Sequence, residues 1–195
     1  MIISLTGFMG SGKSSVGKEL RAQTGWEFID LDLYVEKKSG RSIPEIFESE
    51  GEAGFRKLEL EALEDILSGV SPEEGKSRNA DMSGNCSILS LGGGTLMTKG
   101  CAELIREKTT CIYLKASTDT LIENLQDSCS GRPMLDKAQD RVQLRKKIED
   151  LMVGREHIYL EAADMTIDID DFGALPASIA GQILHSLGGR INRKP

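Results

Sequence analysis

The chain opens with MIISLTGFMGSGKSS at residues 1–15, and this stretch decides its fold. Ile2, Ile3 and Leu5 form a short apolar run, which is typical of a strand buried on both faces of a sheet. Residues 7–14 match the pattern G-x-x-x-x-G-K-[ST], and the residues after them have the spacing of a helix. Strand, glycine-rich loop and helix in this order predict a phosphate-binding loop, or P-loop.

This loop predicts a site for a nucleoside triphosphate. Lys13 can reach the outer phosphates, and the Ser14 hydroxyl can ligate Mg²⁺. The residues expected to contact ATP here are Gly10, Ser11, Gly12, Lys13, Ser14 and Ser15. The alternative is a glycine-rich turn with an exposed lysine and no ligand, and the flanking strand and helix argue against it.

Composition limits the class of protein. The 195 residues, 39% of them hydrophobic, predict a single domain over 1–195, at most one with a lid. A net charge of −7 argues against nucleic acid or an anionic membrane as the main partner. No apolar stretch approaches the roughly 20 residues of a membrane helix, and the immediate P-loop strand leaves no room for a secretory signal. Four cysteines without a C-x-x-C pair predict reduced thiols and a cytoplasmic protein.

Two carboxylates end the second expected strand, residues 26–32. Asp30 and Asp32 are two residues apart, so on a strand both would point to one face, ~6.5 Å apart. The carboxyl ends of parallel strands line the ligand crevice, which places both beside the P-loop. One could bind Mg²⁺ through its waters, and the other could accept a proton from a hydroxyl. A polar strand end is the alternative, and the adjacent P-loop favours the functional interpretation.

Three arginines are candidates for binding anions. Arg56 lies three residues from Glu59 on an expected helix, as a structural pair or as a ligand-binding arginine that Glu59 holds. Arg132, between a glycine and a proline in a polar segment, fits a lid that closes over phosphates. Arg155 falls on the apolar stripe of one long expected helix, 142–163, so it needs a partner, either an internal carboxylate or an anionic ligand.

Residues 86–94, CSILSLGGG, predict a buried strand that runs into three glycines. The glycines leave backbone N–H groups bare and allow close approach, and Ser90 is a candidate for ordering Mg²⁺-bound water. The preceding residues, 68–85, are almost free of large apolar side chains and predict an exposed insertion.

Alternating strands and helices led by a P-loop predict a three-layer α/β/α domain with a five-stranded parallel sheet. A guanine-binding N-K-x-D motif is absent, which counts against a GTPase switch. A small kinase fits the remaining residues, with ATP as donor and a hydroxylated acid as acceptor, because the guanidinium fork of arginine binds carboxylate.

The chain resembles the shikimate kinase family of P-loop enzymes over most of its length. The motifs are GFMGSGKS (7–14), FIDLD (28–32), GRSIPEIFESEGEAGFRKLE (40–59), LSLGGG (89–94), GRPML (131–135) and REHIYLEAA (155–163). The resemblance implies a nucleoside-monophosphate-kinase-like fold and transfer of the ATP γ-phosphate to the 3-hydroxyl of shikimate. It also implies a cytoplasmic step of aromatic amino-acid biosynthesis, usually by a monomer.

The resemblance also implies roles for individual residues. Acceptor-binding helices would cover about 33–62 and a mobile lid about 117–140. The catalytic residues would be Lys13, Asp32 and Arg132, with Arg132 also on the ATP phosphates. Mg²⁺ would be held by Ser14 and Asp30. Shikimate would be held by Asp32, Arg56, the backbone at Gly93, and Arg155.

One departure from the family concerns adenine. Residues 124–127, NLQD, offer no arginine to stack on the base, so Phe172 or Pro176 is expected to cover it instead. Two other functions are possible for such a sequence. A kinase for another hydroxy acid, such as gluconate, should not need both the 40–59 block and Arg155. A nucleotide-binding paralogue without turnover should lack Lys13, Asp32 or the lid arginine, and all three are present.

Overall fold

The computed structural model describes residues 1–69, 86–126 and 140–191. Within these ranges, five strands form one parallel sheet in the order β2-β3-β1-β4-β5. They are β1 (Ile2–Thr6), β2 (Glu27–Asp30), β3 (Ser87–Ser90), β4 (Thr110–Lys115) and β5 (Met165–Asp168). Because β1 is central, the P-loop leaves from the middle of the carboxyl edge of the sheet. The predicted five-stranded parallel α/β fold is confirmed.

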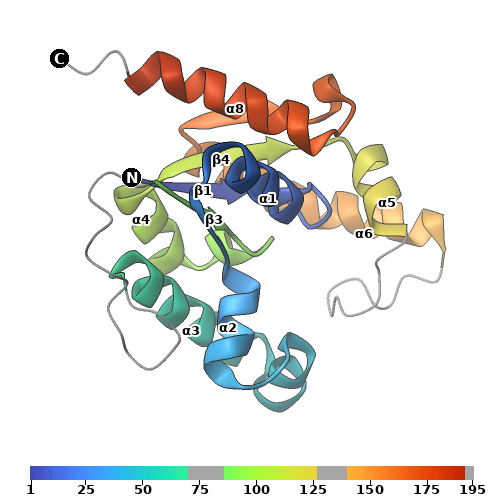
Figure 1. The fold of residues 1–195 in the computed structure, drawn as a ribbon. Helices are drawn as coiled ribbons and strands as arrows, with labels where there is room; N and C mark the ends of the chain where they lie inside the picture. Colours follow the sequence, from blue (N-terminus) through green and yellow to red (C-terminus); the bar gives the residue numbers. More distant parts are fainter. Residues whose placement is uncertain (70–85, 127–139, 192–195) are drawn as a thin grey trace.

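Helices cover both faces of this sheet, which makes three layers (Figure 1). The first four are α1 (Lys13–Thr24), α2 (Leu31–Ser39), α3 (Ile43–Leu67) and α4 (Lys99–Lys108). They are followed by α5 (Thr118–Gln126), α6 (Arg141–Val153), α7 (Glu156–Ala162) and α8 (Pro176–Ile191). Two 3₁₀ turns, η1 (Thr95–Met97) and η2 (Asp170–Phe172), complete the described elements. In the described part of the chain, no helix combines the length and apolarity needed to span a membrane.

The sheet separates two apolar cores. Leu20 of α1 and Ile183 of α8 pack with β1 on one face, and both are buried. Leu63 of α3 and Ile105 of α4 pack on the other face with Tyr159 of α7. Alternate residues of each buried strand serve the two cores, as expected for a parallel sheet covered on both sides.

The second strand is shorter than predicted. It ends at Asp30, and α2 begins at Leu31, so Asp32 lies in the first helical turn. The prediction that Asp30 and Asp32 share one face of a strand is therefore wrong. The cause is local, because Asp30 Oδ1 accepts hydrogen bonds from the amides of Asp32 (3.1 Å) and Leu33 (3.4 Å) and so caps the helix.

The predicted single helix over 142–163 is also wrong, because it is two helices. Gly154 and Arg155 separate α6 from α7, and Arg155 has the non-helical angles φ −122° and ψ −31° as the N-cap of α7. A glycine weakens the helix at this point. The break directs Arg155 toward the carboxyl edge of the sheet.

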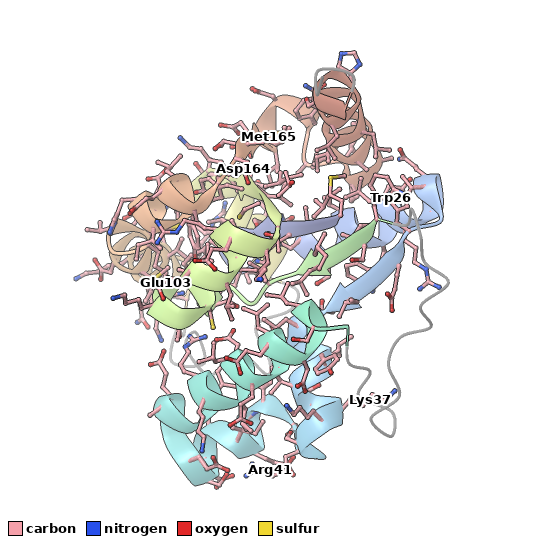
Figure 2. The ribbon with its side chains drawn as sticks, turned by 90° about the vertical axis from the view of Figure 1, so that its left-hand side faces the viewer. Trp26, Lys37, Arg41, Glu103, Asp164 and Met165 are labelled. Atoms are coloured by element: carbon pink, nitrogen blue, oxygen red, sulfur yellow. The ribbon has the colours of Figure 1, made fainter. Side chains whose placement is uncertain are left out.

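The ends of α2 and α3 are formed by residues that favour helix termini. Gly40 ends α2 in a left-handed conformation, φ 67°, and Ser42 with Glu45 forms the capping box of α3. Gly51, with φ 68° and ψ −171°, divides α3 into two helical segments. Arg41 lies at the tip of this pair, far from the sheet (Figure 2).

Several predictions concern residues that lie outside the described part of the chain. The predicted insertion includes residues 70–85, and the predicted lid includes residues 127–139, with Arg132 and Cys129. The other cysteines, Cys86, Cys101 and Cys111, are free thiols as expected.

Candidate active site

The P-loop is held in a tight turn between β1 and α1. Gly10 has φ 86°, and a Cβ on it would lie 2.9 Å from Cγ of Leu125, so only glycine fits. The Lys13 ammonium folds back over the loop, and its Nζ donates to the carbonyls of Gly7 (2.8 Å) and Phe8 (2.9 Å). The loop therefore presents its amides and a lysine at the start of a helix, the arrangement that binds phosphate.

A hydroxyl and a carboxylate meet beside this loop. Ser14 Oγ donates to Asp30 Oδ2 at 2.6 Å, and Ser90 Oγ lies 3.4 Å from Ser14 Oγ. Mg²⁺ prefers hard oxygen ligands and takes one or two carboxylates together with phosphates and waters. The hydroxyl and carboxylate oxygens of Ser14 and Asp30 fit the ligand preference of Mg²⁺.

Asp32 is the carboxyl group with the most perturbed protonation in the site. Its pKa is raised from 3.8 to about 6, chiefly by burial and then by the nearby charges of Glu59 and Asp30, while Lys13 and Arg56 partly offset these effects. A carboxylate with a raised pKa is a better proton acceptor and is still ionised at neutral pH. The site thus contains a tuned base.

Arg56 is fixed by ion pairs on its own helix. Its Nη1 lies 2.7 Å from Glu59 Oε2 and its Nη2 lies 3.2 Å from Glu52 Oε1. A Cβ on Gly94 would be 2.3 Å from Arg56 Nη2, so the glycine run makes room for the guanidinium. The ring of Phe55 lies 5.2 Å from the guanidinium carbon. The structure contains the Arg56–Glu59 pair, and Arg56 also faces the cavity described below.

Two side chains from α7 converge on Gly93. Arg155, buried with 6% exposure, donates from Nη1 to the Gly93 carbonyl at 3.5 Å, and the Tyr159 hydroxyl donates to the same oxygen. On its other side, a Cβ at Gly93 would lie 3.0 Å from the amide nitrogen of Met9. Gly93 therefore lies between α7 and the P-loop, with room for no side chain.

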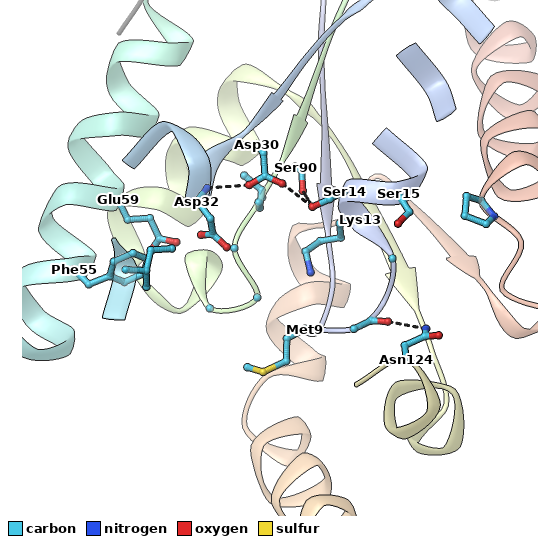
Figure 3. A pocket seen from close by; sticks show the side chains of 18 of the residues that line it. Met9, Lys13, Ser14, Ser15, Asp30, Asp32, Phe55, Glu59, Ser90 and Asn124 are labelled. Carbon is cyan, nitrogen blue, oxygen red and sulfur yellow. Dashed lines mark hydrogen bonds between the residues drawn. The ribbon is translucent and has the colours of Figure 1, made fainter. Parts of the chain in front are cut away.

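One cavity of about 550 Å³ joins the P-loop to the acceptor-side residues (Figure 3). The predicted residues that line it are Gly10, Gly12, Lys13, Ser14, Ser15, Asp30, Asp32, Arg56 and Gly93. The lining residues in the described part of the chain do not include Ser11 or Arg155, which are both buried behind the surface.

The nucleotide end of the cavity contains a contact that sequence reasoning missed. Asn124 of α5 donates from Nδ2 to the Gly10 carbonyl at 2.8 Å and lines the cavity. Pro176 also lines it, as one of the two residues expected near adenine. Phe172, the other, packs against the core on the α1–α8 side. An asparagine carries no recognisable local signal for such a bond.

The acceptor end has an apolar wall that was also missed. Ile43 and Phe47 of α3 line it together with Phe55, and the two phenyl rings are 5.0 Å apart. In a sequence, apolar residues on a helix are normally assigned to the hydrophobic core. Only the fold shows that these three residues line the cavity.

The comparisons with known proteins agree with this geometry. The shikimate kinase family model matches residues 9–72 and 73–187. The chain belongs to the shikimate kinase family.

Relatives and solved structures of the same family cover most of the chain. The shikimate kinase of Chlorobium phaeobacteroides is 37% identical over 98% of the chain and 91% of that protein. The one from Chlorobaculum tepidum is 42% identical over 83% of the chain and 78% of that protein. Among structures, shikimate kinase from Acinetobacter baumannii in complex with shikimate gives a TM-score of 0.81 at 30% identity, covering 97% and 93% of the two chains. The Aquifex aeolicus enzyme gives 0.71 at 30% identity, covering all of both chains.

Proposed function

We propose that this enzyme transfers the γ-phosphoryl group of ATP to the 3-hydroxyl of shikimate, a step of aromatic amino-acid biosynthesis. The observation that carries the proposal is the single cavity that joins Lys13 of the P-loop to Asp32 and Arg56. A donor site and an acceptor site that share one cavity are what direct phosphoryl transfer requires. Family membership and the likeness to an enzyme solved with shikimate support the choice of acceptor.

Asp32 is the residue proposed to act on the acceptor hydroxyl. The hydroxyl proton moves to a carboxylate oxygen of Asp32 as the hydroxyl oxygen attacks the γ-phosphorus. Lys13, released from its carbonyl partners, and Arg132 from the lid would neutralise the phosphate oxygens during transfer. Mg²⁺, when held at Ser14 and Asp30, supplies charge stabilisation for the phosphates.

The acceptor would be oriented by Arg56, the backbone at Gly93, and Arg155. Arg56 lies at the cavity wall with its guanidinium already fixed by Glu59, so little side-chain entropy is lost on binding a carboxylate. Arg155 is buried beside the glycine run, with its Nη1 3.5 Å from the carbonyl oxygen of Gly93.

The remaining predictions stand as proposals for the same enzyme. They are one kinase domain over 1–195, acceptor-binding helices at about 33–62, a lid at about 117–140, an exposed insertion at 68–85, ATP with Mg²⁺ as cofactor, a monomer, and a cytoplasmic location. Ser11 and Ser15 belong to the proposed ATP contacts through the loop backbone and the start of α1.

A coupled ADP-release assay tests the function. With ATP and Mg²⁺ present, we expect kcat/KM for shikimate to exceed that for gluconate by at least about 10²-fold, because the two acids place their hydroxyls differently around the carboxylate. Equal turnover of both acids, or none with shikimate, would refute the proposed reaction.

A further inference from the structure

Thr95 is a buried polar residue outside the predicted site. It begins η1, directly after the glycine run, and has no exposed surface. Its Oγ1 lies 2.6 Å from Glu59 Oε1 and 3.0 Å from the Gly92 carbonyl oxygen. A hydroxyl has one proton to donate, and the closer, charged carboxylate is the stronger acceptor.

The carboxylate of Glu59 thus has a different donor on each oxygen. Thr95 donates to Oε1, and Arg56 Nη1 donates to Oε2 at 2.7 Å. Glu59 itself has no exposed surface, so an oxygen that lost its donor would be left unsatisfied unless the surrounding residues moved. The threonine hydroxyl therefore fixes the rotation of the carboxylate to which Arg56 is paired.

Arg56 has a competing partner. Its Nη2 lies 3.2 Å from Glu52, whose side chain is 54% exposed, one helical turn earlier on α3. Gly94 crowds the same nitrogen from the other side, because a Cβ there would be 2.3 Å away. A small rotation of the Glu59 carboxylate would thus leave Arg56 free to follow Glu52 toward solvent.

We propose that Thr95 is a positioning residue for the acceptor: through Glu59 it holds the Arg56 guanidinium at the cavity wall. The proposal rests on the proposed function, in which Arg56 binds the acid. The hydrogen bond from Thr95 to Glu59 joins η1 to α3, two elements that are far apart in sequence. Glu59 lines the cavity beside Phe55 and Asp32 (Figure 3). Thr95 touches no ligand in this account, so its effect appears in acceptor binding and not in the chemical step.

The test is Thr95→Val, which keeps the shape of the side chain and removes the hydroxyl. Loss of a hydrogen bond to a buried charge should raise both KM and Kd for shikimate by about 5- to 20-fold. The KM for ATP and kcat should stay within about twofold, since the P-loop is untouched. Thr95→Ser, which restores the hydroxyl, should bring shikimate binding back to within about twofold of the original enzyme. If Thr95→Val does not fold, Thr95→Ala supplies the same comparison.

A double-mutant cycle separates positioning from packing. In an Arg56→Ala background, Thr95→Val should have no further effect on kcat/KM for shikimate, because the residue through which it acts is gone. Thr98→Val is the matched control on the same segment, where the side chain makes no capping bond. Unchanged shikimate binding in Thr95→Val, equal rises in both KM values, or full additivity with Arg56→Ala would each overturn the inference. These outcomes leave the proposed reaction intact, whereas the absence of shikimate turnover in the original enzyme would refute that reaction itself.

Discussion

Ser14 and Asp30 are joined by a 2.6 Å hydrogen bond, from the serine hydroxyl to Oδ2 of the carboxylate. The other oxygen, Oδ1, accepts from the amides of Asp32 and Leu33 and caps α2. One carboxylate thus fixes the first turn of α1 relative to the first turn of α2. The Asp30 carboxylate therefore holds the P-loop and the proposed base, Asp32, in a fixed position relative to each other.

Asp30→Asn should separate the two tasks of Asp30. Asparagine caps helices as well as aspartate does, so the free energy of unfolding should change by less than about 0.5 kcal/mol. The Mg²⁺ concentration for half-maximal activity should rise about 10- to 100-fold, as for other changes that weaken a metal site. Asp30→Ala, by comparison, should also lose about 1 kcal/mol of stability. Thermal unfolding and Mg²⁺ titrations give both readouts, and a normal Mg²⁺ requirement in Asp30→Asn would exclude this residue from the metal site.

Asp32→Asn should slow catalysis and stabilise the ligand-free protein. The expected fall in kcat is about 10²-fold or more, with ATP binding retained. The pKa of Asp32 rises from 3.8 to about 6 on folding, so the folded state holds its proton more tightly than the unfolded chain does. The ionised carboxylate therefore costs stability above about pH 6, on the order of 1–2 kcal/mol after allowance for partial solvation, and this penalty fades as the pH falls toward 4.

Chemical unfolding of Asp32→Asn and the original protein, without nucleotide and with a chelator, measures this difference. The variant should be more stable at pH 7.5, and its advantage should shrink at pH 5. A variant that is less stable at pH 7.5 would show that the carboxylate has a structural role. A near-normal kcat would remove Asp32 from the chemistry.

Gly94→Ala should damage the acceptor site through Arg56. The backbone at Gly94, with φ −118° and ψ 2°, suits any residue, so the substitution adds no backbone strain. Its Cβ would lie 2.3 Å from Arg56 Nη2 and displace the guanidinium. We expect KM for shikimate to rise about tenfold or more, with KM for ATP unchanged.

Gly100→Ala makes the same glycine-to-alanine change at another site and serves as the control for Gly94→Ala. Gly100 lies in α4, where a new Cβ would make an ordinary 3.4 Å contact with Leu60. This variant should keep its kinetics and gain about 0.5–1 kcal/mol of stability, the usual effect of alanine over glycine in a helix. Similar kinetic losses in both variants would mean that the Gly94 effect does not depend on Arg56.

Arg155→Lys should weaken the acceptor while keeping the charge. Lysine lacks the planar fork, so it cannot bind a carboxylate ligand through two parallel N–H groups while it contacts the Gly93 carbonyl. We expect shikimate binding to weaken by roughly 1.5–3 kcal/mol, the scale of a charged hydrogen bond. Arg106→Lys, at a half-exposed arginine of α4, is the control and should bind shikimate normally. Calorimetric titration measures both, and equal binding in the two variants would assign Arg155 a structural role only.

Local sequence patterns predicted much of this molecule, because their physics is local. The P-loop, the capping box of Ser42 with Glu45, and the stop at Gly40 all depend on residues within a few positions of one another. The five-stranded parallel sheet follows from the alternation of strands and helices, whereas the order of its strands was not predicted. The Arg56–Glu59 pair follows from helical spacing.

Two boundaries were predicted wrongly, the end of β2 and the break between α6 and α7, because contacts that the local sequence pattern does not show decide them. An aspartate after a strand serves equally as a strand residue or as a helix cap, and only the amide contacts of Asp30 decide between them. The break before Arg155 is stabilised by contacts with Gly93, which is 62 residues away in the chain. The bond between Thr95 and Glu59 spans 36 residues, and no local pattern could have indicated it.

The folded-back lysine of the P-loop has a consequence for ligand choice. The Lys13 ammonium already donates to two carbonyl oxygens, at 2.8 and 2.9 Å, so an incoming anion competes with these bonds for its N–H groups. Phosphate binding is then an exchange of partners, in which the net gain is the difference between two sets of hydrogen bonds. A lone small anion recovers little from that exchange, whereas a triphosphate also occupies the loop amides and the metal corner. We therefore expect the resting loop to bind a triphosphate more tightly than free phosphate or sulfate.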